Sequence, residues 1–165
     1  MQTRTAEGTS TSILAPGIRR DWSWSIALLD TPILHPDNAS FHRVWKARHI
    51  ASGLPSFSDF TFEDLAPWLG SVSIARAQNG DMELELIGCS MTNQAGEEIS
   101  RVNLADCKFG PVGQNAREML ETVTGMGVIA LPCRSTEWRN QSIGWHGLAL
   151  PLADNAALIC LFVLQ

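Results

Sequence analysis

The chain has 165 residues, of which 45% are hydrophobic and 18% are charged, and its formal net charge is −5. This length predicts one domain with a sizeable core. The acidic balance and the lack of a basic stripe argue against binding to nucleic acid. No apolar stretch approaches the roughly 18 residues that a membrane-spanning helix needs, so no membrane association is expected.

The cysteines are not spaced as the CxxC pair of a zinc ribbon or of a thioredoxin-type redox motif. No secretory signal is recognisable either. We therefore expect a cytoplasmic protein whose thiols are reduced and serve mainly as small hydrophobic side chains. These residues are Cys89, Cys107, Cys133 and Cys160.

Residues 1–36 are predicted to form a flexible leader, because its first part is rich in Thr, Ser, Gly and Ala without an apolar period. The leader contains an apolar patch at 22–29 that includes Trp22, Trp24 and Leu28. Two interpretations of this patch stay open. It packs on the domain's own sheet, or it forms an interface with a partner chain.

A helix is predicted over 38–52, because apolar residues recur there at helical spacing and a glycine follows. His35, His42 and His49 recur along this segment. His42 and His49 share a helix face but lie about 10.5 Å apart along its axis. Ligands of one ion, each about 2 Å from it, cannot be so far apart. The sequence therefore predicts an exposed helix face and no metal site, and it gives His35 no special role.

The second half of the chain predicts a sheet. Asn79 and Gly80 are typical of a hairpin turn, and the residues after them alternate between apolar side chains and glutamates. Three further strands are predicted over 128–138, 142–151 and 157–164. Pro132 argues that the first of these three lies at a sheet edge.

A longer helix is predicted between the two groups of strands, around an apolar stripe that Gly125 and Gly127 end. The stripe consists of Ala116, Met119, Leu120 and Val123. Helices and an antiparallel sheet in this order give an α+β fold class.

The connector before the hairpin carries a recognisable motif. It reads Leu54-Pro55-Ser56, Ser58-Asp59-Phe60, Asp64-Leu65 and Pro67-Trp68-Leu69-Gly70. This resembles the entry motif LPSRSDFDP…DLxPxLG of a single-domain PAS subfamily common in alphaproteobacteria. Phe57 stands where Arg is usual, and Thr61-Phe62-Glu63 replaces the Asp-Pro step. Residues 84–89, 96–99 and 150–154 are similar to the subfamily's RLVGT, GRELTG and LPLADDG segments, the second only in part.

The resemblance covers 54–165 and, with the preceding helix, defines a PAS-like domain over 37–165. It implies a five-stranded antiparallel sheet with helices on one face, plus the N-terminal helix. PAS domains usually sense signals or dimerise, and no GxSxG, HExxH or P-loop motif occurs, so no enzymatic activity is expected. The resemblance implies a sensor or adaptor that acts through protein contacts, with a homodimer and a signalling partner such as a histidine kinase.

The alternative is a receptor whose apolar cavity holds a ligand or cofactor. The candidate lining residues, which in the opposite interpretation simply fill the core, are Met119, Val123, Cys133, Trp138, Trp145 and His146. No cofactor is predicted. Cys107 lacks the surroundings of a flavin-adduct cysteine, and 111–127 lacks the histidine that a haem would need. The resemblance nevertheless leaves haem and flavin open.

Overall fold

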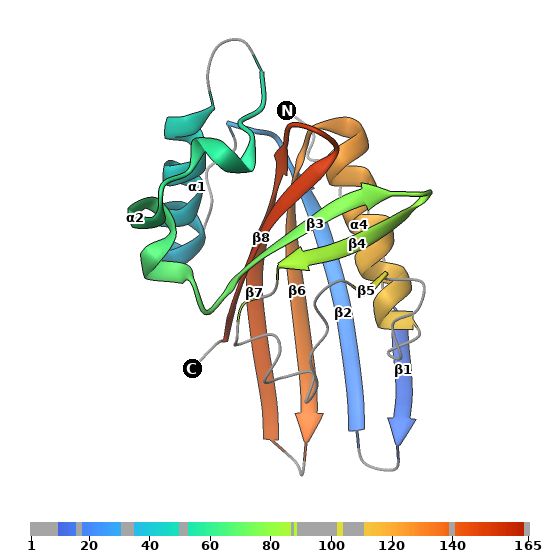
Figure 1. The fold of residues 1–165 in the computed structure, drawn as a ribbon. Helices are drawn as coiled ribbons and strands as arrows, with labels where there is room; N and C mark the ends of the chain where they lie inside the picture. The colour runs from blue at the N-terminus through green and yellow to red at the C-terminus, as the bar shows by residue number, and fades with distance from the viewer. Residues whose placement is uncertain are drawn as a thin grey trace.

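The computed structural model describes residues 10–15, 18–30, 35–49, 53–86, 88, 102–103, 111–138 and 141–163. Of 10–15, 18–23, 86, 102–103, 111–115, 133–138, 141–145 and 163 it describes the backbone only. Within these ranges the fold is α+β, as predicted. Eight strands form one antiparallel sheet in the order β1-β2-β6-β7-β8-β3-β4-β5 (Figure 1).

The elements follow one another along the chain with short connections. They are β1 (Ser10–Ala15), β2 (Ile18–Ala27), α1 (Pro36–Arg48), η1 (Phe57–Asp59), α2 (Phe62–Leu65), η2 (Ala66–Trp68), β3 (Val72–Gln78), β4 (Asp81–Leu86), β5 (Val102–Asn103), α4 (Pro111–Met126), β6 (Ile129–Trp138), β7 (Gln141–Leu152) and β8 (Ala156–Val163).

The described part of the predicted leader is sheet, so the prediction of a flexible segment is wrong for β1 and β2. The β2 strand pairs with β6 from Ile18 opposite Trp138 to Ala27 opposite Ile129. Residues 22–26 alternate between large apolar residues and serines, which is the period of a strand. The sheet is therefore larger than the five strands expected. The five expected strands are contiguous within it, as β6-β7-β8-β3-β4.

Pro132 lies in an inner strand, which corrects the prediction that β6 is an edge. The β6–β7 register places Pro132 opposite Gly147. The N–H of Leu161, the β8 neighbour of Gly147, donates to Ser71 on the far side of β8. The carbonyl of Gly147 therefore faces Pro132, which has no N–H to donate. The Nδ2 of Asn38 in α1 donates to this carbonyl at 3.1 Å, so the proline is accommodated without an orphaned acceptor.

Helices cover both faces of the sheet, not one face as predicted. The α4 helix contacts all the described strands except β5, and the sheet curves around it (Figure 1). The α1 helix lies on the opposite face, against β7 and β8. Successive strand residues point to opposite faces, so Leu148 packs towards α1 whereas Ala149 packs towards α4. Both β7 and β8 are apolar on both faces, as a strand buried on each side requires.

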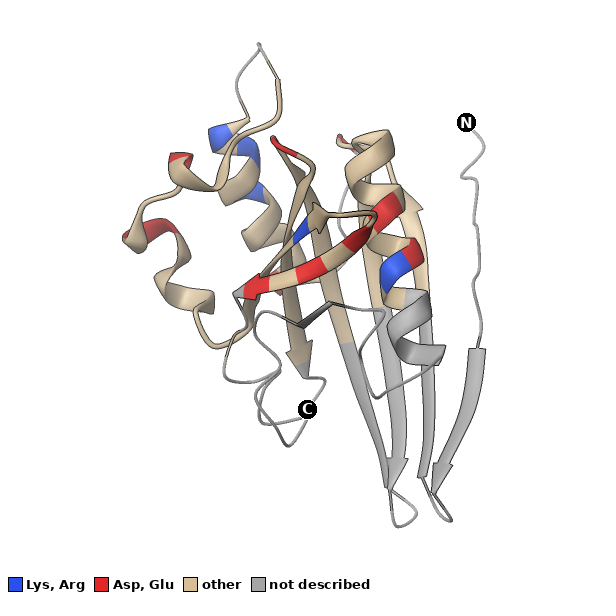
Figure 2. Cartoon of the chain, turned by 45° about the vertical axis from the view of Figure 1, so that its right-hand side comes forward, with Lys and Arg blue, Asp and Glu red and all other residues tan. Residues whose placement is uncertain are grey.

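Local sequence signals are confirmed. Asn79 and Gly80 form the β3–β4 turn with φ angles of 52° and 80°, as a two-residue hairpin needs. Met82 and Leu84 are buried, whereas the acidic residues of β4 form a band on its outer side (Figure 2). The α4 helix is followed by Gly127 at φ 62°. The predicted helix 38–52 is observed as Pro36–Arg48.

Gly147 is required by close packing. A Cβ atom there would lie 2.7 Å from the Cys160 carbonyl oxygen and 3.1 Å from Cγ of Pro132, and would also meet Leu161. We expect Gly147→Ala to lower the free energy of unfolding in urea by about 1–3 kcal/mol. Gly125→Ala is the matched control, because open space surrounds Gly125 on α4 and the helix gains about 0.5–1 kcal/mol. Equal stability of the two variants would contradict this account.

Candidate functional site

Two histidines and an aspartate meet where α1 begins against the sheet. The donor atoms of His35, Asp37 and His146 all lie within 4.8 Å of one another. His35 is the N-cap of α1, and Pro36 occupies the first helical turn, where its missing N–H is tolerated. Asp37 also lies in the first turn, where the helix dipole favours a carboxylate. Nδ1 of His35 lies 3.6 Å from Oδ2 of Asp37.

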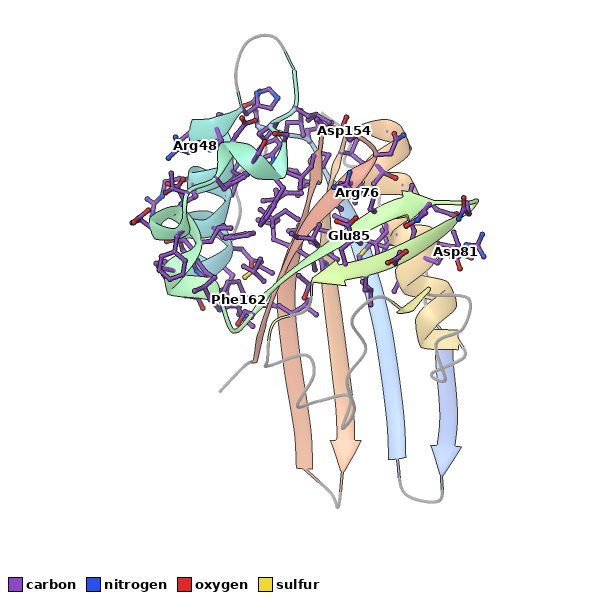
Figure 3. All side chains as sticks on the ribbon, in the orientation of Figure 1. Arg48, Arg76, Asp81, Glu85, Asp154 and Phe162 are labelled. Carbon is purple, nitrogen blue, oxygen red and sulfur yellow. The ribbon has the colours of Figure 1, made fainter. Side chains whose placement is uncertain are left out.

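His146 reaches this cluster from β7. Its Nε2 lies 3.9 Å from Oδ2 of Asp37, and its side chain is only 13% exposed. One face of its ring stacks on Phe162 of β8, labelled in Figure 3, with centroids 5.0 Å apart. The ring of His35 lies 3.5 Å away, centroid to centroid. Aromatic contacts from two different elements therefore fix the plane of the His146 ring.

Asn38 decides which nitrogen of His146 carries the proton. The buried Asn38 donates its Nδ2 to Gly147, so its Oδ1 faces His146 and accepts from Nδ1 at 3.2 Å. Burial lowers the pKa of His146, and nearby His35 lowers it further, whereas Asp37 acts in the opposite direction. Near neutral pH the ring is neutral with its proton on Nδ1. Its Nε2 lone pair then faces a carboxylate, which is also an acceptor.

The cluster offers ligands rather than a nucleophile. Two imidazoles and one carboxylate are donors for a metal ion or groups for proton transfer. Cys160 is buried and free, and burial, with a smaller effect of Asp37, raises the pKa of its thiol. That thiol stays protonated and contributes no thiolate to the site.

The predicted pocket residues do not form one site. Met119 and Val123 are buried in the core between α4 and the sheet. His146 lies on the opposite face, beside α1. Cys133, Trp138 and Trp145 belong to β6 and β7, and their side chains lie outside the described part of the structure.

The predicted interface residues are also separated. Trp24 is buried in the core beneath α4, so its prediction as an interface residue is wrong and the intramolecular interpretation holds. Its Nε1 has no hydrogen-bond partner among the described residues. Leu28 is 56% exposed, and the side chain of Trp22 lies outside the description.

The predicted exposed histidine face is wrong for His42. This residue is buried, and its Nε2 donates to the carbonyl of Leu29 at 3.0 Å while its ring stacks on Trp45. The His35–Asp37–His146 cluster was not predicted from the sequence, because its members are far apart along the chain. The available signals were a histidine before a helix-starting proline and a second histidine between glycines.

Comparisons with protein-family models, curated proteins and solved structures return no match for this chain. Among the helices that the structure describes, none has the length and apolar character needed to cross a bilayer. Function is therefore argued from the residues themselves.

Burial of His42 predicts a pH-dependent stability. Burial lowers its pKa below the usual value of about 6.5, so the unfolded chain takes up this proton at higher pH than the folded chain. The stabilisation is fully present above about pH 6.5 and is lost as the pH falls below it. We expect the free energy of unfolding in urea to decrease between about pH 7.5 and pH 5.5, and to decrease less in His42→Gln, whose amide can donate to Leu29. His49→Gln, on the same helix, is the control, and identical slopes for wild type and His42→Gln would contradict the prediction.

Proposed function

We propose that this protein is a PAS-like sensor or adaptor that acts through protein contacts and has no enzymatic activity of its own. The observation that carries the proposal is the arrangement of five strands around one helix. Two strands (β3, β4) come first, then α4, then three strands (β6, β7, β8), and in the sheet they are contiguous as β6-β7-β8-β3-β4. This is the order of elements that the sequence resemblance implies. Proteins of this kind use the covered sheet as a platform for a ligand or a partner.

The motif between residues 54 and 70 supports the proposal, because its polar residues hold the connector in a defined shape. Asp59 accepts from the backbone N–H of Ser56 at 2.7 Å, and Asp64 accepts from that of Thr61 at 2.8 Å. Asp64 also binds both ways to Arg48 of α1, at 2.6 and 2.8 Å (Figure 3). These contacts fix η1 and α2 and attach the connector to α1.

The same connector presents apolar side chains to solvent. Leu65 and Trp68 pack into the α1 core, whereas Phe57, Phe62 and Leu69 are exposed. The fold does not use these exposed side chains, and a rigid element with exposed apolar residues is suited to a protein interface. We assign the contact with a signalling partner, such as a histidine kinase or a second copy of this chain, to this connector.

Phe62 offers a direct test of the contact. Phe62 and Met126 are 69% and 68% exposed, but Met126 lies at the end of α4 and not on the connector. We expect Phe62→Ser to reduce recovery of a signalling protein, in crosslinked affinity purification from the native organism, by about tenfold, the effect of about 1.4 kcal/mol. Met126→Ser is the matched control and should retain the partner. A strictly monomeric chain that recovers no signalling protein would overturn the proposal.

A second function is favoured by Trp24. Its Nε1–H is buried towards the α4 core without a partner among the described residues, and such a donor costs about 1–3 kcal/mol when nothing accepts from it. A small apolar molecule carrying one acceptor would satisfy it. The protein would then be a receptor whose ligand lies between α4 and the sheet.

Trp24→Phe separates the two functions, since it removes the donor and keeps most of the apolar area. For a receptor, native mass spectrometry of freshly purified wild type shows a bound small molecule that Trp24→Phe loses. For a contact module without ligand, the wild type has its bare mass, and Trp24→Phe is no less stable in urea, because an unpaired donor has been removed. A bare mass therefore counts against the receptor.

A further inference from the structure

The cluster at the start of α1 brings together acceptors without a cation between them. The Nε2 lone pair of neutral His146 faces Oδ2 of Asp37 at 3.9 Å, and Nδ1 of His35 lies 3.6 Å from the same oxygen. Lone pairs and a negative charge that converge in this way repel one another unless a positive charge lies between them. We propose that His35, Asp37 and His146 bind a divalent first-row transition metal ion, with Zn²⁺ as the ion that fits the donor set.

The distances fit such an ion after small side-chain rotations. Ligands about 2.0–2.1 Å from a tetrahedral ion lie about 3.3 Å apart. The two separations from Asp37, 3.6 and 3.9 Å, exceed that value by a few tenths of an ångström, and the donor atoms as a set lie within 4.8 Å. The long bond of 3.3 Å from the Asp37 N–H to Nδ1 of His35 is the contact that an ion would replace. Neither movement requires a change in the backbone.

The groups behind His146 are those that a metal-binding histidine requires. A ligating histidine donates its other ring N–H to a carbonyl or carboxylate, which fixes the tautomer and the ring orientation. Here Nδ1–H of His146 donates to Oδ1 of Asn38, and the Gly147 carbonyl holds Asn38 in turn. Phe162 supports the ring from the β8 side. His146 is therefore oriented for an ion before one binds.

The donor set selects the class of ion. Imidazole nitrogens suit Zn²⁺, Fe²⁺, Co²⁺, Ni²⁺ and Cu²⁺, whereas Mg²⁺ and Ca²⁺ prefer sites made of oxygen ligands alone. His35 and Asp37 are partly exposed, so an ion can enter from solvent and keep at least one position for water or a further ligand. The positive end of the α1 dipole opposes a cation by about 0.3–1 kcal/mol. Three coordinate bonds outweigh an effect of that size.

Metal binding by the full chain, freed of metal with EDTA, tests the proposal. We expect Zn²⁺ to bind at one ion per chain in isothermal titration calorimetry, and Co²⁺ to produce d–d absorption bands without a thiolate charge-transfer band. Asp37→Asn and His146→Gln should each weaken binding by at least about tenfold, and Asn38→Ala, behind the ligands, by about tenfold. His49→Gln, which changes a histidine outside the cluster, should bind as the wild type does.

Asp37 is exposed, so Asp37→Asn is expected to fold normally, which circular dichroism and urea unfolding will check. Two results would overturn the proposal. One is the absence of saturable binding of Zn²⁺ or Co²⁺ to the wild type. The other is equal affinity of the wild type, Asp37→Asn and His146→Gln, or a cobalt spectrum dominated by thiolate charge transfer, since either places the ion elsewhere on the chain.

Discussion

The hydrogen bond from Asn38 to Gly147 resolves the main conflict in the sheet. Pro132 lies in an inner strand without an N–H, and the Gly147 carbonyl opposite it would be left unpaired in a buried environment. Such an acceptor costs about 1–3 kcal/mol. The side chain of Asn38 supplies the missing donor from outside the sheet at 3.1 Å. A proline can therefore lie next to the centre of this sheet only if the first turn of α1 lies over β7.

This requirement fixes the position of α1 and, with it, the histidine cluster. A second bond, from Nε1 of Trp45 to the carbonyl of Pro151 at 3.0 Å, ties the later turns of α1 to the end of β7. Two bonds to one strand, with Phe41 and Trp45 buried between them, set both the direction and the height of the helix. The first turn then faces His146, so the geometry that satisfies the backbone also creates the candidate metal site.

Patterns within a few residues were predictable from the sequence, whereas pairings across the chain were not. The Asn79–Gly80 turn and the α4 stripe follow from local chemistry, and both are confirmed. The alternation of tryptophan and serine before residue 27 was a strand signal, but the polar residues preceding it suggested a flexible leader. The edge prediction for Pro132 assumed that only solvent can replace its missing bond. A side chain of α1 does so here, and no local pattern shows which helix lies over which strand.

The proposals concern different faces of one sheet, and β7 contributes to both. Its residues alternate, so that His146 and Leu148 face α1 while Ala149 faces the core that contains Trp24. An ion beside α1 and a ligand beneath α4 would contact the same strand from opposite sides without sharing a side chain. Loss of metal binding in Asp37→Asn therefore leaves the α4 core intact, and Trp24→Phe leaves the metal ligands in place. Each result bears on one proposal only, because the strand between the two sites separates their chemistry.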